Sequence, residues 1–499
     1  RLRWVGIVVG SFGLLVGCAG GADDGEFADG DALGSGGVVG LGGSPGNPTG
    51  GAVGTPAGGS PGSGGSPAVA GSGGVGESTG GAPESGGAVG SGGAVGTGGS
   101  VGTGGAVGTG GSSGTGGAVG TGGSSGTGGS SAWFPCDGSE SGYQAVVKGG
   151  GSSWTVTGGS AGASSHSNLA DALGSAYGRL TAGRTSKQAV LVQGNGAIDA
   201  SAQIKMPSYL VLNVCGTIDV TGTAAGSDRS PLYARDRTQI DIPHARLTGN
   251  AQYAMFFRSV SNIHLGEIEL EMNPANSGIG IRIDNNPSAG GAKVTNVRVD
   301  HLVAEGTGSH AIETYGVDGI EIGTVEATNT GECGVLLNAT VNAEVGEVHC
   351  QNCAAGTGYA AFRIANDAGK IGSTWPAGNI HVGHVYARQG GRGIFSVSGS
   401  GGLLIDTIDI ANTGNNAILL QNCQNTTIAG QSGTVQNGTI VLSNDTTNTN
   451  NGTFAASANV LLRNLTLGSS ATLSEAWCQL GDRGNRAQNI SGGSVDMCF

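Results

Sequence analysis

Nine residues in the middle of the chain have the chemistry of a saccharide site and recur at intervals that suit a repeated structure. They are Arg282, Asp284, His310, Glu313, Tyr315, Glu332, Tyr359, Arg363 and Arg392. The guanidinium groups of arginine bind carboxylates and hydroxyls, and tyrosine rings pack on sugar faces. Histidine, tyrosine and carboxylate side chains can transfer protons. A fold that brought these residues together would present a surface suited to a polysaccharide.

A lyase is the first reaction that such a surface would support. It needs cations that neutralise a uronate carboxylate and a base that removes the proton beside it. The three arginines would supply the cations, and His310, Tyr315 or Tyr359 would supply the base. Lys370 is another candidate base.

A glycoside hydrolase would use the same residues differently. It needs two carboxylates, about 5 Å apart for retention or about 6.5–9.5 Å apart for inversion. Asp284 with Glu313, or Glu313 with Glu332, are the candidate pairs. For the two reactions together, the expected catalytic residues are His310, Glu313, Tyr315 and Arg363, and the expected substrate-binding residues are Arg282, Asp284, Glu332, Tyr359 and Arg392.

The elements that must position these residues are short strands repeated over residues 278–428. Gly323 and Gly346 are 23 residues apart, as are Gly383 and Asp406. A fixed step of this size, with short strands and no helical period, predicts a solenoid whose coils stack about 4.8 Å apart. We therefore expect an all-β fold, a right-handed parallel β-helix. Its inward anchors would be Ile281, Ile312, Val335, Phe362, Ile394 and Ile418.

Aligning these anchors predicts which side chains point outward, because side chains alternate along a strand. The first outward column reads Arg282, Glu313, Leu336, Arg363, Phe395 and Leu419. The second reads Asp284, Tyr315, Asn338, Ala365, Val397 and Gln421. At the strand entrances, two residues before the anchor, stand His310, Cys333 and Arg392, with Glu332 and Tyr359 one place earlier. The nine candidates would thus gather on one outer face. The alternative is a solvated face carrying ion pairs between coils, such as Arg282 with Glu313.

Two segments before the repeats extend this picture. Apolar residues from Asn168 to Leu180 follow a helical period, and this helix, capped by Ser167 or Asn168, would cover the open first coil. A strand–Pro–Ser–strand–Gly segment follows from Ile204 to Gly216. Together with the coils, residues 165–499 resemble the pectate-lyase-like superfamily of right-handed β-helices.

The resemblance implies a polysaccharide-active protein, since the superfamily includes polygalacturonases and several polysaccharide lyases. Family frequency favours a lyase acting on a uronate-containing glycan. The paired-aspartate and Gly-His-Gly motifs of polygalacturonases and the Arg-x-Pro-x-x-Arg segment of pectate lyases are absent, so no catalytic residue carries over. A non-catalytic glycan-binding protein or adhesin stays open, although the insertion Ala365–Gly378 favours a walled cleft.

The N-terminus has the features of a secretory signal. Arg1 and Arg3 precede an apolar run, Trp4–Val16, that is too short to span a membrane. The ending Leu-Val-Gly-Cys18 resembles the lipobox of bacterial lipoproteins, in which the cysteine is lipidated. An ordinary signal peptide with an incidental cysteine is the alternative. The expected location is the outer face of the cell envelope, as an outer-membrane lipoprotein, or the medium after secretion.

Composition then divides the chain. Residues 36–130 consist almost wholly of Gly, Ser, Ala, Val, Thr and Pro, which cannot bury enough apolar surface to fold. We expect a signal peptide at 1–18, a flexible linker at 19–131 and the β-helix at 132–499. Residues 300–350 contain nine acidic residues and no Lys or Arg, which argues against a nucleic-acid partner. We expect a monomer without a dedicated metal site, in which Ca²⁺ could bridge the acidic coils and a polyanion.

Cysteine usage suits an oxidising compartment. Of nine cysteines, eight remain once Cys18 is set aside, an even number that predicts disulfides. Cys478 and Cys498 could staple a C-terminal cap. Short bridges are also expected among Cys333, Cys350, Cys353 and Cys423. The single Cys-x-x-Cys has no second pair at zinc-ligand spacing, so disulfides are the expected use.

Overall fold

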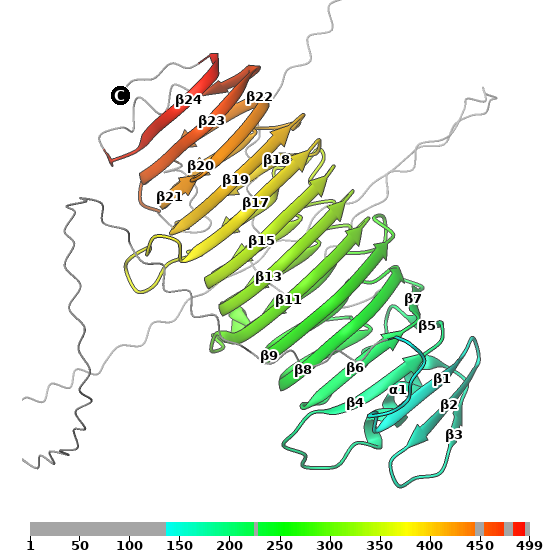
Figure 1. Ribbon diagram of the computed structural model, residues 1–499. Helices are drawn as coiled ribbons and strands as arrows, with labels where there is room; N and C mark the ends of the chain where they lie inside the picture. Colours follow the sequence, from blue (N-terminus) through cyan, green and yellow to red (C-terminus); the bar gives the residue numbers. More distant parts are fainter. Residues whose placement is uncertain (1–135, 224–227, 445–453, 474–482, 495–499) are drawn as a thin grey trace, which may run out of the picture. The chain divides into compact units, whose positions relative to one another are not determined.

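The computed structural model describes residues 136–223, 228–444, 454–473 and 483–494. The predicted signal peptide, Cys18 and the predicted linker lie outside these residues. In the described part, 24 strands form one hydrogen-bonded sheet that winds along the chain (Figure 1). β11 (Val294–Glu305) pairs in parallel with β9 (Tyr253–Met272) one coil earlier and β13 (Val317–Thr328) one coil later. The chain is a parallel β-solenoid, in agreement with the predicted fold class.

Short and long strands alternate from β10 to β19, so that each coil contributes one of each. The N-terminal part contains β1 (Ala145–Gly150), β2 (Ser153–Gly158), β3 (Ser164–His166), α1 (Leu169–Gly178), β4 (Gln188–Gln193), β5 (Gly196–Asp199), β6 (Leu210–Cys215), β7 (Thr217–Thr221) and β8 (Leu232–Gly249). The later coils contain β10 (Ile279–Asp284), the 3₁₀ turn η1 (Pro287–Ala289), β12 (Ile312–Tyr315), β14 (Val335–Asn338), β15 (Val341–Gln351), β16 (Ala360–Ala365), β17 (Ile380–Arg388), β18 (Arg392–Ser396), β19 (Leu403–Ala411), β20 (Ile418–Gln421), β21 (Gln424–Ile428), β22 (Ser432–Ser443), β23 (Ala458–Leu473) and β24 (Arg486–Ser494).

The N-terminal end is closed by a small cap. β1 and β2, and then β2 and β3, pair antiparallel, and β1 also pairs in parallel with β4. The helix α1 begins after Asn168, whose side chain accepts a hydrogen bond from the backbone N–H of Asp171 at 2.8 Å. Its apolar side, Leu169, Ala172, Leu173 and Ala176, is buried. The predicted capping helix is confirmed.

The solenoid interior is one continuous apolar core. The six predicted inward anchors are all fully buried: Ile281, Ile312, Val335, Phe362, Ile394 and Ile418. Each is paired in register with the anchor of the next coil. No single coil could bury these side chains, so the stacking of coils supplies the hydrophobic stabilisation.

Glycine recurs at one position of successive coils where the backbones approach closely. A Cβ atom on Gly346 would lie 2.4 Å from the carbonyl oxygen of Gly323, and one on Gly323 would lie 2.3 Å from that of Asp300. Gly383 meets the carbonyl oxygen of Gly346 at 2.7 Å in the same way. Successive coils approach so closely here that any side chain would collide with the backbone of the coil before it.

Asparagines fix bends in the long strands. Asn262, Asn296 and Asn342 all have positive φ, which asparagine tolerates better than most residues. Their amides also bond between coils: Asn296 Nδ2 donates to Asn262 Oδ1, and Asn379 Nδ2 to Asn342 Oδ1, both at 2.7 Å. These ladders hold the bends in line from coil to coil.

Two disulfides form among the described cysteines. Cys350 pairs with Cys353, one of the short bridges expected, and Cys136 pairs with Cys215 across 79 residues. Cys333 and Cys423 are buried free thiols. The predicted staple of Cys478 and Cys498 lies outside the described residues. Within the described ranges, the chain contains no helix with the length and apolar character needed to cross a bilayer.

Candidate functional site

The outer side of β10, β12, β14, β16 and β18, with the adjoining first part of β9, is called the arginine face below. The predicted register is confirmed. The first outward column runs through Arg282, Glu313, Leu336, Arg363, Phe395 and Leu419 in paired positions. The second pairs Asp284 with Tyr315, Asn338 and Ala365 in turn. The two columns thus bring five of the nine candidates to one face: Arg282, Asp284, Glu313, Tyr315 and Arg363.

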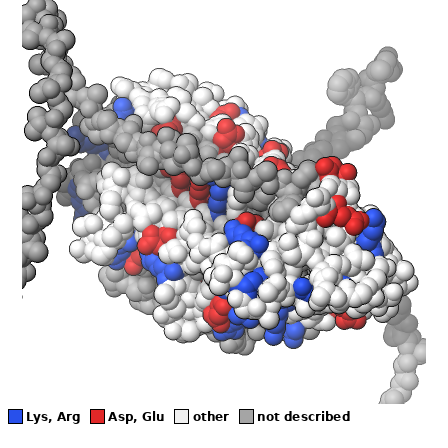
Figure 2. Space-filling model, turned by 60° about the horizontal axis from the view of Figure 1, so that its bottom comes forward, with Lys and Arg blue, Asp and Glu red and all other residues white. Residues whose placement is uncertain are grey.

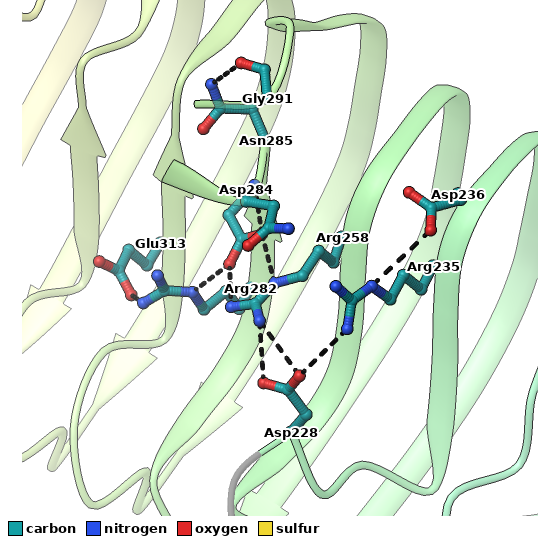
Figure 3. A network of polar contacts seen from close by, with 10 residues as sticks. Asp228, Arg235, Asp236, Arg258, Arg282, Asp284, Asn285, Gly291 and Glu313 are labelled. Carbon is teal, nitrogen blue, oxygen red and sulfur yellow. Dashed lines mark hydrogen bonds and ion pairs between the residues drawn. The ribbon is translucent and has the colours of Figure 1, made fainter. Parts of the chain in front are cut away.

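A buried ion network occupies the early coils of the arginine face (Figure 3). Arg282 donates to Asp284 at 2.9 Å and to Glu313 at 2.6 Å, and its side chain is nearly buried. Arg258 donates to the other side of Asp284 at 2.9 Å and reaches Asp228 at 3.1 Å. Each charge in this ladder faces an opposite charge on a neighbouring coil or strand position, which is the arrangement that makes a buried ion tolerable.

The network fixes the ionisation of its members. Burial alone would raise the pKa of Asp284, but the guanidinium groups of Arg258 and Arg282 outweigh it, so that pKa lies below its usual range. Burial opposes the charge of Arg282, yet Glu313 and Asp284 raise its pKa above the ordinary arginine value. Asp284 therefore stays a carboxylate at neutral pH and has no proton to donate.

Sequence reasoning missed two members of the network, Arg258 and Asp228. Arg258 pairs with Asp284 in register and so belongs to the second outward column, one coil before the first coil that was aligned. Extending the alignment back to Met255, which is in register with Ile281, would have found it. Asp228 lies in the connection before β8, where no strand period points to it.

A second cluster is built around His310 and Glu332. The backbone N–H of Cys333 donates to His310 Nδ1 at 3.0 Å, which assigns the ring proton to Nε2. Nε2 faces Glu332 Oε2 at 3.2 Å, and the hydroxyl of Ser309 donates to the same oxygen. Burial, assisted by Arg363 and Arg282 and opposed by Glu332, lowers the pKa of His310 to about 4. The imidazole is therefore neutral near pH 7, with both nitrogens engaged.

Glu332 is the more accessible member of that pair. Its side chain is 24% exposed, against 6% for His310. Both side-chain contacts to its carboxylate go to Oε2, and no described residue bonds Oε1. Oε1 is thus available to a ligand on the arginine face.

Arg363 differs from Arg282 although both stand in the same column. Its guanidinium lies 4.6 Å from the ring centre of Tyr359 and 4.9 Å from that of Phe395. The residue is only 8% exposed, and its Nε has no hydrogen-bond partner. Among the described residues, no carboxylate lies within ion-pair distance of it. Arg363 is a buried cation held by aromatic rings rather than by an opposite charge.

The remaining candidates surround these clusters. Arg392 lies 4.7 Å over the ring of Phe395, and its Nε donates to the side-chain oxygen of Asn416 at 3.3 Å. Tyr359 packs its ring edge-on against His310 at 5.4 Å. Tyr315 is half-buried in the second column.

The insertion after β16 folds back on the next coils. Trp375 Nε1 donates to the carbonyl of Gly399 at 2.6 Å, and Asn425 donates to the carbonyl of Trp375 at 2.6 Å. Lys370 pairs with Asp367 at 2.9 Å. The insertion is therefore anchored to the following coils through Trp375. The candidate base Lys370 is already engaged by a carboxylate of the insertion itself.

A separate groove lies on other strands, beside the Cys136–Cys215 disulfide. It has a volume of about 490 Å³, and its lining includes His244, Glu267 and His301. None of the nine predicted residues lines it. Over the described residues, no group of three His, Cys, Asp or Glu side chains is placed to hold a metal ion. Figure 2 shows basic side chains interspersed with acidic ones over the visible surface.

Two histidines outside the arginine face bridge neighbouring coils. His301 faces Glu267 through Nδ1 at 2.8 Å and Glu326 through Nε2 at 3.2 Å. His381 makes the same kind of bridge between carboxylates of β15 and β19, at 2.7 and 3.0 Å. Partial burial works against the charged imidazole, but the carboxylates outweigh it and raise the pKa of both histidines above 6.5.

No protein-family model matches the chain, and no curated protein sequence matches it. Two solved structures are similar to it, both A-modules of mannuronan C-5 epimerases from Azotobacter vinelandii. The AlgE4 module is 13% identical over 62% of this chain and 89% of its own, with a TM-score of 0.28. The AlgE6 module is 10% identical over 66% and 92%, with a TM-score of 0.27. Similarity this low says nothing of activity, and the solenoid fold rests on the chain's own strand pairing.

Proposed function

We propose that the arginine face binds a uronate-containing polysaccharide and that the protein is a polysaccharide lyase. The observation that carries the proposal is Arg363, a buried guanidinium with no carboxylate partner among the described residues. Burying a charge without a counter-ion is costly. A uronate carboxylate would supply the missing counter-ion through charge-assisted hydrogen bonds.

Glu332 is the base in this proposal. Two observations support this role: its side chain is 24% exposed, and no described residue bonds its Oε1. His310 is a positioning residue, because Cys333 N–H occupies its Nδ1 and its Nε2 proton faces Glu332. This assignment departs from the expectation that His310 itself is the base.

The reaction is an elimination that balances without a cofactor. Glu332 takes the proton from the carbon beside the substrate carboxylate, and the electron pair of that C–H bond forms a C=C bond. The bond from the adjacent carbon to the leaving sugar oxygen then breaks. Burial raises the pKa of Tyr359 to about 12, so the phenol keeps its proton at neutral pH and is suited to give it to the leaving oxygen. Arg363 neutralises the negative charge that develops on the carboxylate.

The hydrolase alternative has less support. It requires one protonated carboxylate as general acid. Asp284 is held ionised by two arginines, and Glu313 is committed to Arg282 and to the amide of Asn338 at 2.9 Å. Arg363 supports a non-catalytic glycan-binding protein equally well. The two proposals differ only in whether the bound glycan is cleaved.

From the sequence alone we also propose that Cys18 is lipidated and anchors a monomer to the outer face of the cell envelope. Labelling with a fatty-acid analogue should mark the chain and should not mark Cys18→Ser. Labelling of both forms, or of neither, would contradict the anchor without touching the glycan proposal.

The proposed function is tested by incubating the purified chain with pectic, alginate, glycosaminoglycan and neutral glycans. Ultraviolet absorbance of unsaturated uronate means a lyase, new reducing ends without it mean a hydrolase, and retention without cleavage means a binding protein. Glu332→Gln should abolish cleavage but keep retention, whereas Arg363→Met should lose both. Full cleavage by Arg363→Met would refute the site.

A further inference from the structure

The arginine face extends beyond the nine candidate residues to an aromatic cluster on β9. Phe256 continues the first outward column one coil before Arg282, with which it is paired in register. Its ring is fully buried and contacts two tyrosines, with ring centres 4.7 Å away for Tyr253 and 5.5 Å away for Tyr233. Tyr233 is only 4% exposed, whereas Tyr253 is half-buried. Tyr253 is therefore the ring of this cluster that reaches the surface.

The surroundings of Tyr253 suit a sugar. Its ring lies against Phe256 with an angle of 35° between the planes, so a second ring supports it from below. The Tyr253 hydroxyl forms no hydrogen bond with a described residue, and burial raises the pKa of this phenol above its ordinary value. It therefore keeps its proton at neutral pH and can donate a hydrogen bond. A supported aromatic ring with a polar tip packs on the apolar face of a sugar and bonds its hydroxyls.

Tyr253 also lies in line with the proposed reaction centre. The first outward column runs from Phe256 through Arg282, Glu313 and Leu336 to Arg363, which is a distance of four coils. At about 4.8 Å per coil the two ends are about 19 Å apart, close to the length of four pyranose units. Arg282 and Glu313, between the ends, are nearly buried and bonded to each other. A glycan laid along the coils would thus gain its contacts mainly at the two ends.

We propose that Tyr253 forms a stacking subsite for a sugar that is remote from the uronate held by Arg363. The site then takes a glycan of at least about five sugars laid along the coils. This inference rests on the proposed function of the arginine face. A short glycan contacts only the surroundings of Arg363 and Glu332, whereas a longer one also packs on the Tyr253 ring.

The test measures the affinity of the full chain for fragments of two and of six sugars, cut from galacturonan, mannuronan and hyaluronan. Every measurement is made in the Glu332→Gln chain, so that no fragment is cleaved. Tyr253→Ala should weaken the binding of six-sugar fragments about tenfold and that of two-sugar fragments less than about twofold, because only the longer glycan loses a ring contact. Tyr253→Phe keeps the ring and should bind six-sugar fragments nearly as tightly as the parent chain.

A second variant and a matched control locate the effect. Tyr253→Leu keeps Phe256 covered and removes only the flat ring, and it should show the same loss for long fragments alone. The control is Tyr386→Ala, which removes another half-buried tyrosine. Tyr386 stacks on His349 at 5.6 Å and belongs to β17, one of the long strands, outside the arginine face. Its removal should leave the affinity for both lengths unchanged.

The outcomes separate the two proposals. If Tyr253→Leu and Tyr253→Ala bind six-sugar fragments as tightly as the parent chain, or lose two-sugar and six-sugar fragments equally, the stacking subsite is overturned while the proposed function stands. If no fragment binds the parent chain, or if Arg363→Met binds like it, the proposed function fails and the subsite fails with it.

Discussion

Two buried arginines of one column should respond in opposite ways to the same substitution. Arg282 and Arg363 stand in the same outward column, separated by the coils of Glu313 and Leu336. Both are less than a tenth exposed. Arg282 is bonded to Asp284 and Glu313, whereas Arg363 packs between aromatic rings. Replacing each by methionine keeps much of the aliphatic stem and removes the charge.

The expected change in unfolding free energy depends on which side chains lose their ionic partner in each variant. Arg282→Met strands Glu313, whose side chain is 7% exposed and keeps only Asn338, while Asp284 retains Arg258. Breaking a buried pair costs about 3–5 kcal/mol, and the retained partner places this case near 3 kcal/mol. Arg363→Met loses cation–π contacts worth about 0.5–2 kcal/mol and relieves an uncompensated buried charge. We expect its free energy of unfolding to change by less than about 1 kcal/mol.

The assay is guanidinium unfolding followed by circular dichroism, with uronate-glycan binding measured on the same samples. Arg282→Met should be destabilised, and Glu313→Gln added to it should recover most of the loss, because no buried charge is then left unpaired. Arg363→Met should have nearly the same unfolding midpoint as the unmodified chain and should bind no glycan. If Arg363→Met loses about 3 kcal/mol and Arg282→Met almost nothing, the assignment of one arginine to structure and the other to function is wrong.

Three further predictions concern the scaffold. Because the folded pKa of His301 and of His381 is raised above 6.5, their stabilisation is fully present below pH 6.5 and is lost as the pH rises through the folded values. Each bridge is partly exposed and stabilises the fold by less than about 1 kcal/mol. Replacing both histidines by glutamine should remove the fall in melting temperature that the unmodified chain shows as the pH rises above 6.5. Gly346→Ala should cost about 2 kcal/mol or more, since its Cβ would lie 2.4 Å from the carbonyl of Gly323; an unchanged denaturation midpoint would show that the coils can move apart. Cys215→Ser should lower the melting temperature and speed proteolysis near residue 136, because the disulfide closes a loop across 79 residues; unchanged digestion would show that the cap holds without it.

The sequence was sufficient to predict the coils and the direction of their side chains. Apolar anchors recur every 23 to 32 residues between short strands, which is typical of a stacked solenoid. Alternation along each strand then places Arg282 beside Glu313, where the structure has an ion pair. The same alternation places Arg363 between Leu336 and Phe395. Both results follow from the recurrence of the anchors and from the alternation of side chains along a strand, and both can be read from the sequence.

What the sequence could not supply depends on distances across coils. The proton on His310 is assigned by a backbone N–H of the next coil, which no spacing rule predicts. Asp228 lies in a connection before β8, so no strand period points to its ion pair with Arg258. The disulfide of Cys136 with Cys215 joins residues whose separation carries no signal of proximity.

The most direct measurement is a crystal structure of the full chain with a bound uronate oligosaccharide. A substrate carboxylate should lie about 2.7–2.9 Å from the guanidinium of Arg363, as charge-assisted pairs do, with the carbon beside it facing Glu332. A glycan bound instead in the groove near His301, with the surroundings of Arg363 unchanged, would contradict the account.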